Sequence, residues 1–115
     1  MRYLALIYTN EATDAKQGTP EAAARYAGYE AFGQEATRRG VLRGGERLRP
    51  VADARTVRVR DGKAVTVDGP FAETKEQLGG YYMLECATEA EAIELAAMIP
   101  GAKDGSIELR PIWDM

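Results

Sequence analysis

The stretch RYLALIY, residues 2–8, decides the fold of this 115-residue chain. Side chains of a strand alternate between its two faces, and in this stretch both sets are apolar. One set is Tyr3, Ala5 and Ile7, and the other is Leu4, Leu6 and Tyr8. We therefore expect a strand in a sheet that is covered on both faces.

A second stretch of the same kind is GYYMLEC, residues 80–86. It predicts another strand that is apolar on both faces. It ends at Cys86, the only cysteine of the chain, which excludes an internal disulfide. We expect Cys86 to be a small buried hydrophobic residue rather than a reactive thiol.

Capping residues predict two helices. Thr19 can cap free backbone N–H groups and is followed by a proline suited to the first turn, so we expect a helix over Pro20–Arg39. Thr88 and Glu91 match a capping box and predict a second helix that runs to Met98.

Short elements fill the remaining chain. Val41–Leu42 opens a strand, and Gly44-Gly45 indicates a bulge or a close backbone approach. Ala72–Gln77 could form one helical turn, and Ser106–Ile112 predicts a closing strand with Ile107 facing inward.

A hairpin is predicted over Thr56–Val67. A two-residue loop would place two of its valines on each face. A three-residue loop, Arg60–Gly62 with Gly62 left-handed, would place all four valines on one face. Because burial decides strand register, we favour the three-residue loop.

The order of elements, β-α-β, hairpin, β-α-β, predicts one α+β domain over residues 1–115. Its fold class is a ferredoxin-like sandwich, with two βαβ units and an inserted β-hairpin. Both helices then cover one face of the sheet and leave the other face bare. Since two strands are apolar on both faces, we expect a homodimer in which a second copy covers the bare face.

Composition excludes several classes of function. The net charge of −3 gives no electrostatic footprint for nucleic acid. The chain has no histidine, which removes Ser-His-Asp and Cys-His catalysis. No carboxylate cluster has a metal-loop spacing and no glycine-rich phosphate loop opens a helix, so we expect neither metal nor cofactor. No stretch predicts a signal peptide or membrane span, so a cytoplasmic location is expected.

Polar side chains are densest over Asp68–Gln77, at the end of a predicted strand. In the functional interpretation, a partly dehydrated Asp68 acts as general acid or base and Lys75 binds an anionic group. In the structural interpretation, Asp68-Gly69-Pro70 is a turn that Phe71 pins to the core as an apolar plug. The residues by themselves favour the structural interpretation, because such turns are common.

The stretch VDGPFAETKEQLGGYY, residues 67–82, resembles the signature of the DGPF-motif branch of the YCII-related family. Residues 1–8, 41–48 and 105–112 resemble that family's opening strand, its Gly-Gly-Glu segment and its closing strand. The resemblance implies a ferredoxin-like chain in a dimeric α/β-barrel assembly. Some relatives are thought to use a His-Asp pair. This chain has no histidine, so the resemblance carries over no such pair. It also implies a regulatory setting, since members of this branch are often encoded beside extracytoplasmic-function sigma factors.

Two functions remain open, and whether the protein is an enzyme is open with them. The first is small-molecule binding in a cleft between the sheet, the first helix and the turn after the hairpin. Asp68 is then the best candidate for a catalytic or orienting residue. The pocket candidates are Asp68, Phe71, Glu73, Lys75 and Tyr81. The second is a non-catalytic regulatory or interaction module linked to a sigma factor. A motif that serves only turn formation and dimer packing is a third interpretation.

Overall fold

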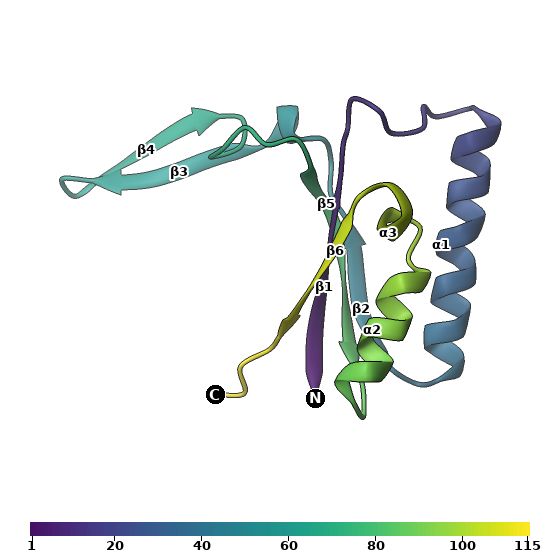
Figure 1. Cartoon of the computed structure of the whole chain (residues 1–115). Coiled ribbons are helices and arrows are strands. Elements are labelled where there is room, and N and C mark those ends of the chain that lie inside the picture. The colour runs from purple at the N-terminus through teal and green to yellow at the C-terminus, as the bar shows by residue number, and fades with distance from the viewer.

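A computed structural model describes all 115 residues (Figure 1). The strands are β1 (Arg2–Thr9), β2 (Leu42–Arg47), β3 (Arg55–Arg60), β4 (Lys63–Asp68), β5 (Gln77–Glu85) and β6 (Ser106–Pro111). The helices are α1 (Pro20–Arg38), α2 (Glu89–Met98) and α3 (Gly101–Asp104), with a short 3₁₀ turn, η1, at Val51–Asp53. No helix is both long and apolar enough to cross a membrane.

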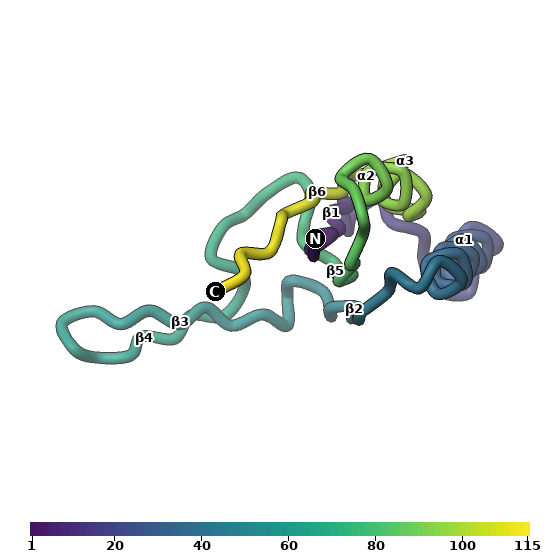
Figure 2. Tube along the Cα trace, turned by 90° about the horizontal axis from the view of Figure 1, so that it is seen from below, coloured from purple at the N-terminus to yellow at the C-terminus, as the bar shows by residue number.

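Four strands form one antiparallel sheet in the order β2-β5-β1-β6. Helix α1 connects β1 to β2, and α2 with α3 connects β5 to β6, so each connection skips over a neighbouring strand. This α+β arrangement is compatible with the predicted ferredoxin-like fold. All three helices lie on the same side of the sheet (Figure 2).

The core lies between the helices and one sheet face. Tyr3, Ala5 and Ile7 of β1 and Leu84 of β5 are buried there against α1 and α2. Cys86 is also buried, as expected. The alternate side chains of β1, which are Leu4, Leu6 and Tyr8, are only half-buried.

The helix starts are confirmed. The Thr19 hydroxyl accepts a hydrogen bond from the Ala22 N–H at 3.2 Å, and the Thr88 hydroxyl accepts one from the Glu91 N–H at 3.2 Å. The Glu91 carboxylate reaches the Ala87 N–H, one residue before the cap. Both caps satisfy donors that the first helical turn leaves free.

The predicted hairpin loop is wrong. Arg60 pairs with Lys63, so the loop has two residues, Asp61 and Gly62, and both have positive φ. Such an Asp-Gly pair forms a primed turn, whose twist matches the flanking strands. The turn geometry therefore outweighs the gain from placing all four valines on one face. In the single chain no core is present beside the hairpin to enforce that burial.

The predicted helical turn at Ala72–Gln77 is also absent. The Thr74 hydroxyl donates to the Glu76 carbonyl at 2.6 Å, and the Gln77 side-chain amide donates to the Thr74 carbonyl. These local bonds compete with helical hydrogen bonds in a segment too short to nucleate a helix. Phe71 is 80% exposed, so its interpretation as a plug into the core is wrong for the single chain.

Both glycine doublets lie at bulges of the sheet. The register of β2 against β5 shifts between Leu42 and Gly44, and that of β1 against β5 shifts opposite Gly79. The strand predicted to open at Val41–Leu42 is β2, which spans Leu42–Arg47 and continues through both glycines. The predicted bulge at Gly44-Gly45 is confirmed.

Candidate ligand-binding cleft between α1 and the sheet

A cleft of about 720 Å³ lies where the first half of α1 passes over β2 and β5. Its lining comes from α1, from the loop before it and from the bulged ends of three strands. Its aromatic and charged lining residues from α1 and from the helix-covered face of the sheet are Arg25, Tyr26, Tyr29, Arg47 and Tyr82. A cleft of this size is typical of sites for small organic molecules.

The cleft exists because α1 packs on the sheet only through its second half. Phe32 and Ala36 are the buried residues of this helix, and both lie beyond its midpoint. Tyr26, in the first half of α1, is 68% exposed at the cleft mouth. At the midpoint, Gly28 contacts Pro100 so closely that a Cβ would lie 2.8 Å from the proline Cγ.

Glycine backbone forms the floor of the cleft. A Cβ on Gly80 would lie 2.8 Å from the Glu46 carbonyl oxygen, and one on Gly45 would lie 2.6 Å from Cδ1 of Tyr82. Larger residues at either position would therefore push the strands or the tyrosine ring out of place. The glycines leave the Tyr82 ring free to form one wall.

Two half-buried tyrosines supply the polar groups of the wall. Burial raises the pKa of Tyr29 and of Tyr82, so both phenols are neutral at pH 7 and can donate hydrogen bonds. The Tyr82 ring is held by Phe32 of α1 at a centroid distance of 4.7 Å. The Tyr29 ring lies under the Arg25 guanidinium at 5.9 Å.

The two arginines of the cleft differ in their partners. Arg25 forms an ion pair with Asp104 at 2.9 Å. Arg47 pairs across the sheet with Gly80, which places it on the helix-covered face, and it forms no ion pair. Arg47 is therefore the guanidinium in this cleft that can receive an anionic group.

Of the five predicted pocket residues, only Tyr81 lines the cleft. Tyr81 pairs with Leu6, so its side chain belongs to the bare face and its backbone to the cleft. Phe71, Glu73 and Lys75 are exposed in the segment between β4 and β5. Asp68, at the end of β4, pairs with Arg55 of the neighbouring strand at 3.1 Å, and its side chain is 87% exposed. The single chain therefore does not dehydrate Asp68.

Sequence reasoning missed Arg47 as a site residue. The pocket candidates predicted from the sequence include Tyr81 but neither Tyr29 nor Tyr82, and the structure brings these two together at the cleft. The available signal was the two glycine doublets, because glycine inside a strand often marks a close approach by another backbone or a ligand. That Gly45 lies opposite Tyr82 and Gly80 lies opposite Arg47 emerges only in the folded sheet.

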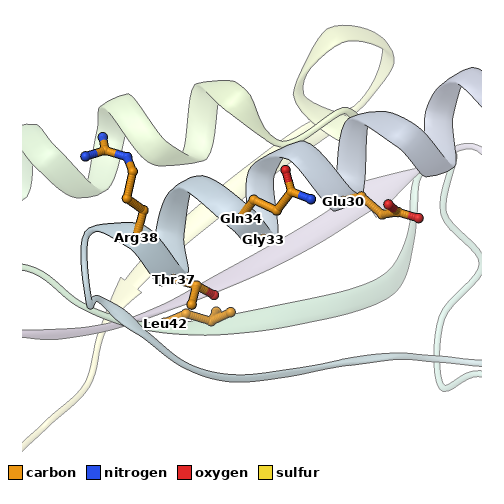
Figure 3. A pocket seen from close by; sticks show the side chains of 6 residues that line it. All are labelled: Glu30, Gly33, Gln34, Thr37, Arg38 and Leu42. Atoms are coloured by element: carbon orange, nitrogen blue, oxygen red, sulfur yellow. The ribbon is translucent and has the colours of Figure 1, made fainter.

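A second hollow, of about 520 Å³, runs along the outer flank of α1. Figure 3 shows its side chains fanning out from the helix, with Arg38 pointing away from Leu42. Arg38 is already paired with Glu35 at 2.6 Å. This hollow has no converging polar groups, which makes it a weaker candidate than the cleft.

Other reactive groups lie outside both hollows. Burial raises the pKa of the Cys86 thiol, so at pH 7 it is protonated and a poor nucleophile. No three carboxylate or thiol side chains gather where they could hold a metal ion. The cleft is thus the main concentration of groups that could bind a ligand.

Comparison with known proteins gives the same family along the whole chain. The sequence profile of the YCII-related domain matches residues 1–115. A relative from Rhizobium meliloti (strain 1021) is 35% identical over 114 residues, which cover 97% of this chain and 92% of that protein. That relative is an uncharacterised protein, so it adds no activity.

Proposed function

Because this chain belongs to the YCII-related family over its whole length, we propose one function for the domain as a unit. It is a homodimer that binds a small planar anion, such as an aromatic carboxylate, in the cleft between α1 and the sheet. The observation that carries this proposal is the convergence of Tyr29, Tyr82 and the unpaired Arg47 on one cleft.

The shape of the cleft favours a flat ligand. The glycine floor removes side chains from β2 and β5, and the Tyr82 ring stands beside it. Aromatic rings attract one another in offset or edge-to-face geometry, so the half-buried Tyr82 ring favours an aromatic ligand.

The charge of the cleft favours an anion. Arg47 offers a planar fork of donors that matches a carboxylate, and no acidic side chain of the chain forms an ion pair with it. The neutral phenols of Tyr29 and Tyr82 add hydrogen-bond donors without adding charge. Glu46 also lines the mouth, but it faces the opposite side of β2 from Arg47.

The homodimer is supported by the bare face of the sheet, here called the open face. It carries half-buried Leu4, Leu6 and Tyr8 from β1 and Tyr81 and Met83 from β5. Charged pairs border it, such as Arg110 with Glu108 on β6. An apolar centre with a polar rim is the usual pattern of a protein interface. Two sheets packed through this face would give the dimeric α/β-barrel assembly.

Isothermal titration calorimetry with benzoate and with salicylate tests ligand binding. We expect binding that Arg47→Gln weakens about tenfold, since a charge-assisted hydrogen bond is lost at a partly exposed site. Arg58→Gln, the same change outside the cleft, is the matched control and should leave the affinity unchanged.

Equal affinities of both variants would contradict the assignment of Arg47. Absence of binding to both carboxylates would contradict the proposed ligand class and would favour the regulatory interaction module instead. A pull-down with the native protein would then be the next measurement.

A further inference from the structure

The β3–β4 hairpin, residues 55–68, is here called the hairpin arm. It projects from the body of the protein (Figure 1), and the radius of gyration of 16.0 Å exceeds the roughly 13 Å of a compact chain of this length. No hydrogen bond or ion pair joins the arm to another helix or strand. The arm therefore receives no stabilisation from the body along its length.

The base of the arm, in contrast, is fixed. The Gly69 N–H donates to the Ala54 carbonyl at 2.8 Å, and the Leu48 N–H donates to the Gly79 carbonyl at 2.8 Å. The Glu11 carboxylate accepts from the Val51 N–H at 3.1 Å. These bonds fix the segments before β3 and after β4 and so give the arm a defined direction.

The two-residue turn sorts the arm into two different faces. In the register of the pairing, Val57 lies opposite Thr66 and Val59 lies opposite Ala64, so one face is uncharged beyond the base. The other face carries three cations and two valines, which are Arg58, Arg60, Lys63, Val65 and Val67. Val57 and Val59 on the uncharged face are 62% and 64% exposed, whereas Val65 and Val67 on the other face are 44% and 49% exposed. The valines of the uncharged face are thus the more exposed to solvent.

Such an arm is poorly stable alone. A two-stranded hairpin is marginal in water unless a third strand or another surface covers it. A row of exposed valines with high strand propensity is also a hazard for uncontrolled association. The uncharged face therefore needs a defined cover.

The direction of the arm identifies the cover. The helices lie on one side of the four-stranded sheet, and the arm extends on the other side, past the open face (Figure 2). Its six-residue strands reach about 20 Å. A second copy packed on the open face would therefore lie alongside the arm.

Charge also favours a second copy. The arm carries four basic and two acidic side chains, a net charge of +2, so the remainder of a chain of net charge −3 carries −5. The arm of one copy and the body of another thus attract each other. A neutral or basic partner would lack this attraction.

We propose that the uncharged face of each hairpin arm packs against the body of the second copy, so that two arms clasp the dimer. This inference rests on the proposed homodimer and adds an interface that the open face alone does not contain. The arm of each chain is then ordered by its partner rather than by its own body.

Sedimentation equilibrium of paired variants tests the clasp. Val57→Thr with Val59→Thr removes apolar surface from the uncharged face and keeps strand propensity. We expect the dimer dissociation constant to rise by about 100-fold, because four valines are lost per dimer. Val65→Thr with Val67→Thr makes the same change on the basic face and is the matched control, expected to alter the constant less than threefold.

Hydrogen exchange of the wild-type arm supplies a second measurement. Amides of residues 55–68 should be protected at protein concentrations above the dimer dissociation constant. They should exchange rapidly at protein concentrations below it. A wild-type protein that dimerises, with equal constants for both variant pairs, would overturn the clasp and leave the open-face dimer standing. A wild-type protein that stays monomeric would overturn both.

Discussion

The two faces of the four-stranded sheet have similar apolar residues but different surroundings. On the covered face, Ala5 and Leu84 are completely buried under α1 and α2. On the open face, Leu4 and Leu6 of the same strand β1 are half-buried and no helix lies over them. The chain covers one apolar side of β1, and in the proposed homodimer a second copy covers the other.

The largest difference between the faces is expected for Leu84→Ala. Leu84 is fully buried among core side chains, so the truncation leaves a cavity and should lower the free energy of unfolding by about 3 kcal/mol. Urea denaturation at a protein concentration below the dimer dissociation constant measures this loss. A loss under about 1 kcal/mol would show that the covered face is not the core of the single chain.

Leu6→Asp separates association from folding. Leu6 lies at the centre of the open face, opposite Tyr81 and Glu108 on the neighbouring strands. We expect the dimer dissociation constant to rise by about 100-fold or more, which corresponds to about 2.7 kcal/mol. The unfolding free energy of the monomer should change by less than about 1 kcal/mol. Loss of monomer stability comparable to that of Leu84→Ala would contradict the difference between the faces.

Thr88→Ala addresses the helices that create the covered face. The Thr88 hydroxyl caps α2 by accepting from the Glu91 N–H, and its loss should lower the unfolding free energy by about 1 kcal/mol. Thermal unfolding measures the change, and Thr88→Ser should restore the cap. Failure of serine to restore stability would show that the threonine acts through its methyl group instead.

The smallest effect is expected for Glu35→Gln, on the contact between α1 and α2. Hydrogen bonds from Arg38 and Arg39 lower the pKa of Glu35 from 4.5 to about 2, and Arg39 also binds Glu94 of α2. A pKa lowered by folding stabilises the protein above pH 4.5, and this contribution is lost as the pH falls toward 2. Glu35→Gln should therefore be less stable than wild type at pH 7, with a gap that narrows below pH 4.5.

Denaturation curves at several pH values measure that gap. Glu30→Gln is the control, because Glu30 lies on the same helix without an ion-pair partner. A gap for Glu35→Gln that stays constant between pH 7 and pH 3 would contradict the role of the two arginines.

Elements whose signals are local could be predicted from the sequence. Thr19 and Thr88 mark the helix starts, and the alternation in residues 2–8 and 80–86 gives the central strands, because capping and strand periodicity depend on neighbours along the chain. Helix α3 could not be found, since four residues leave no periodic pattern. The hairpin register was missed because burial was assumed where the single chain offers none.

The candidate site was less accessible from the sequence. Arg47 and Tyr82 come from β2 and β5, which are separated by the entire hairpin arm, and Tyr29 comes from α1. Their convergence depends on how α1 packs, with Phe32 against Tyr82 of β5 and Gly28 against Pro100. The motif at residues 67–82 identifies the family, but most of its polar residues lie outside the cleft.

The open face as a protein interface is the central claim, and sedimentation equilibrium of the wild-type protein at micromolar concentration tests it most directly. We expect a mass of two chains, and a mass of one chain for Leu6→Asp under the same conditions. A wild-type protein with the mass of one chain across the concentration range would contradict the claim.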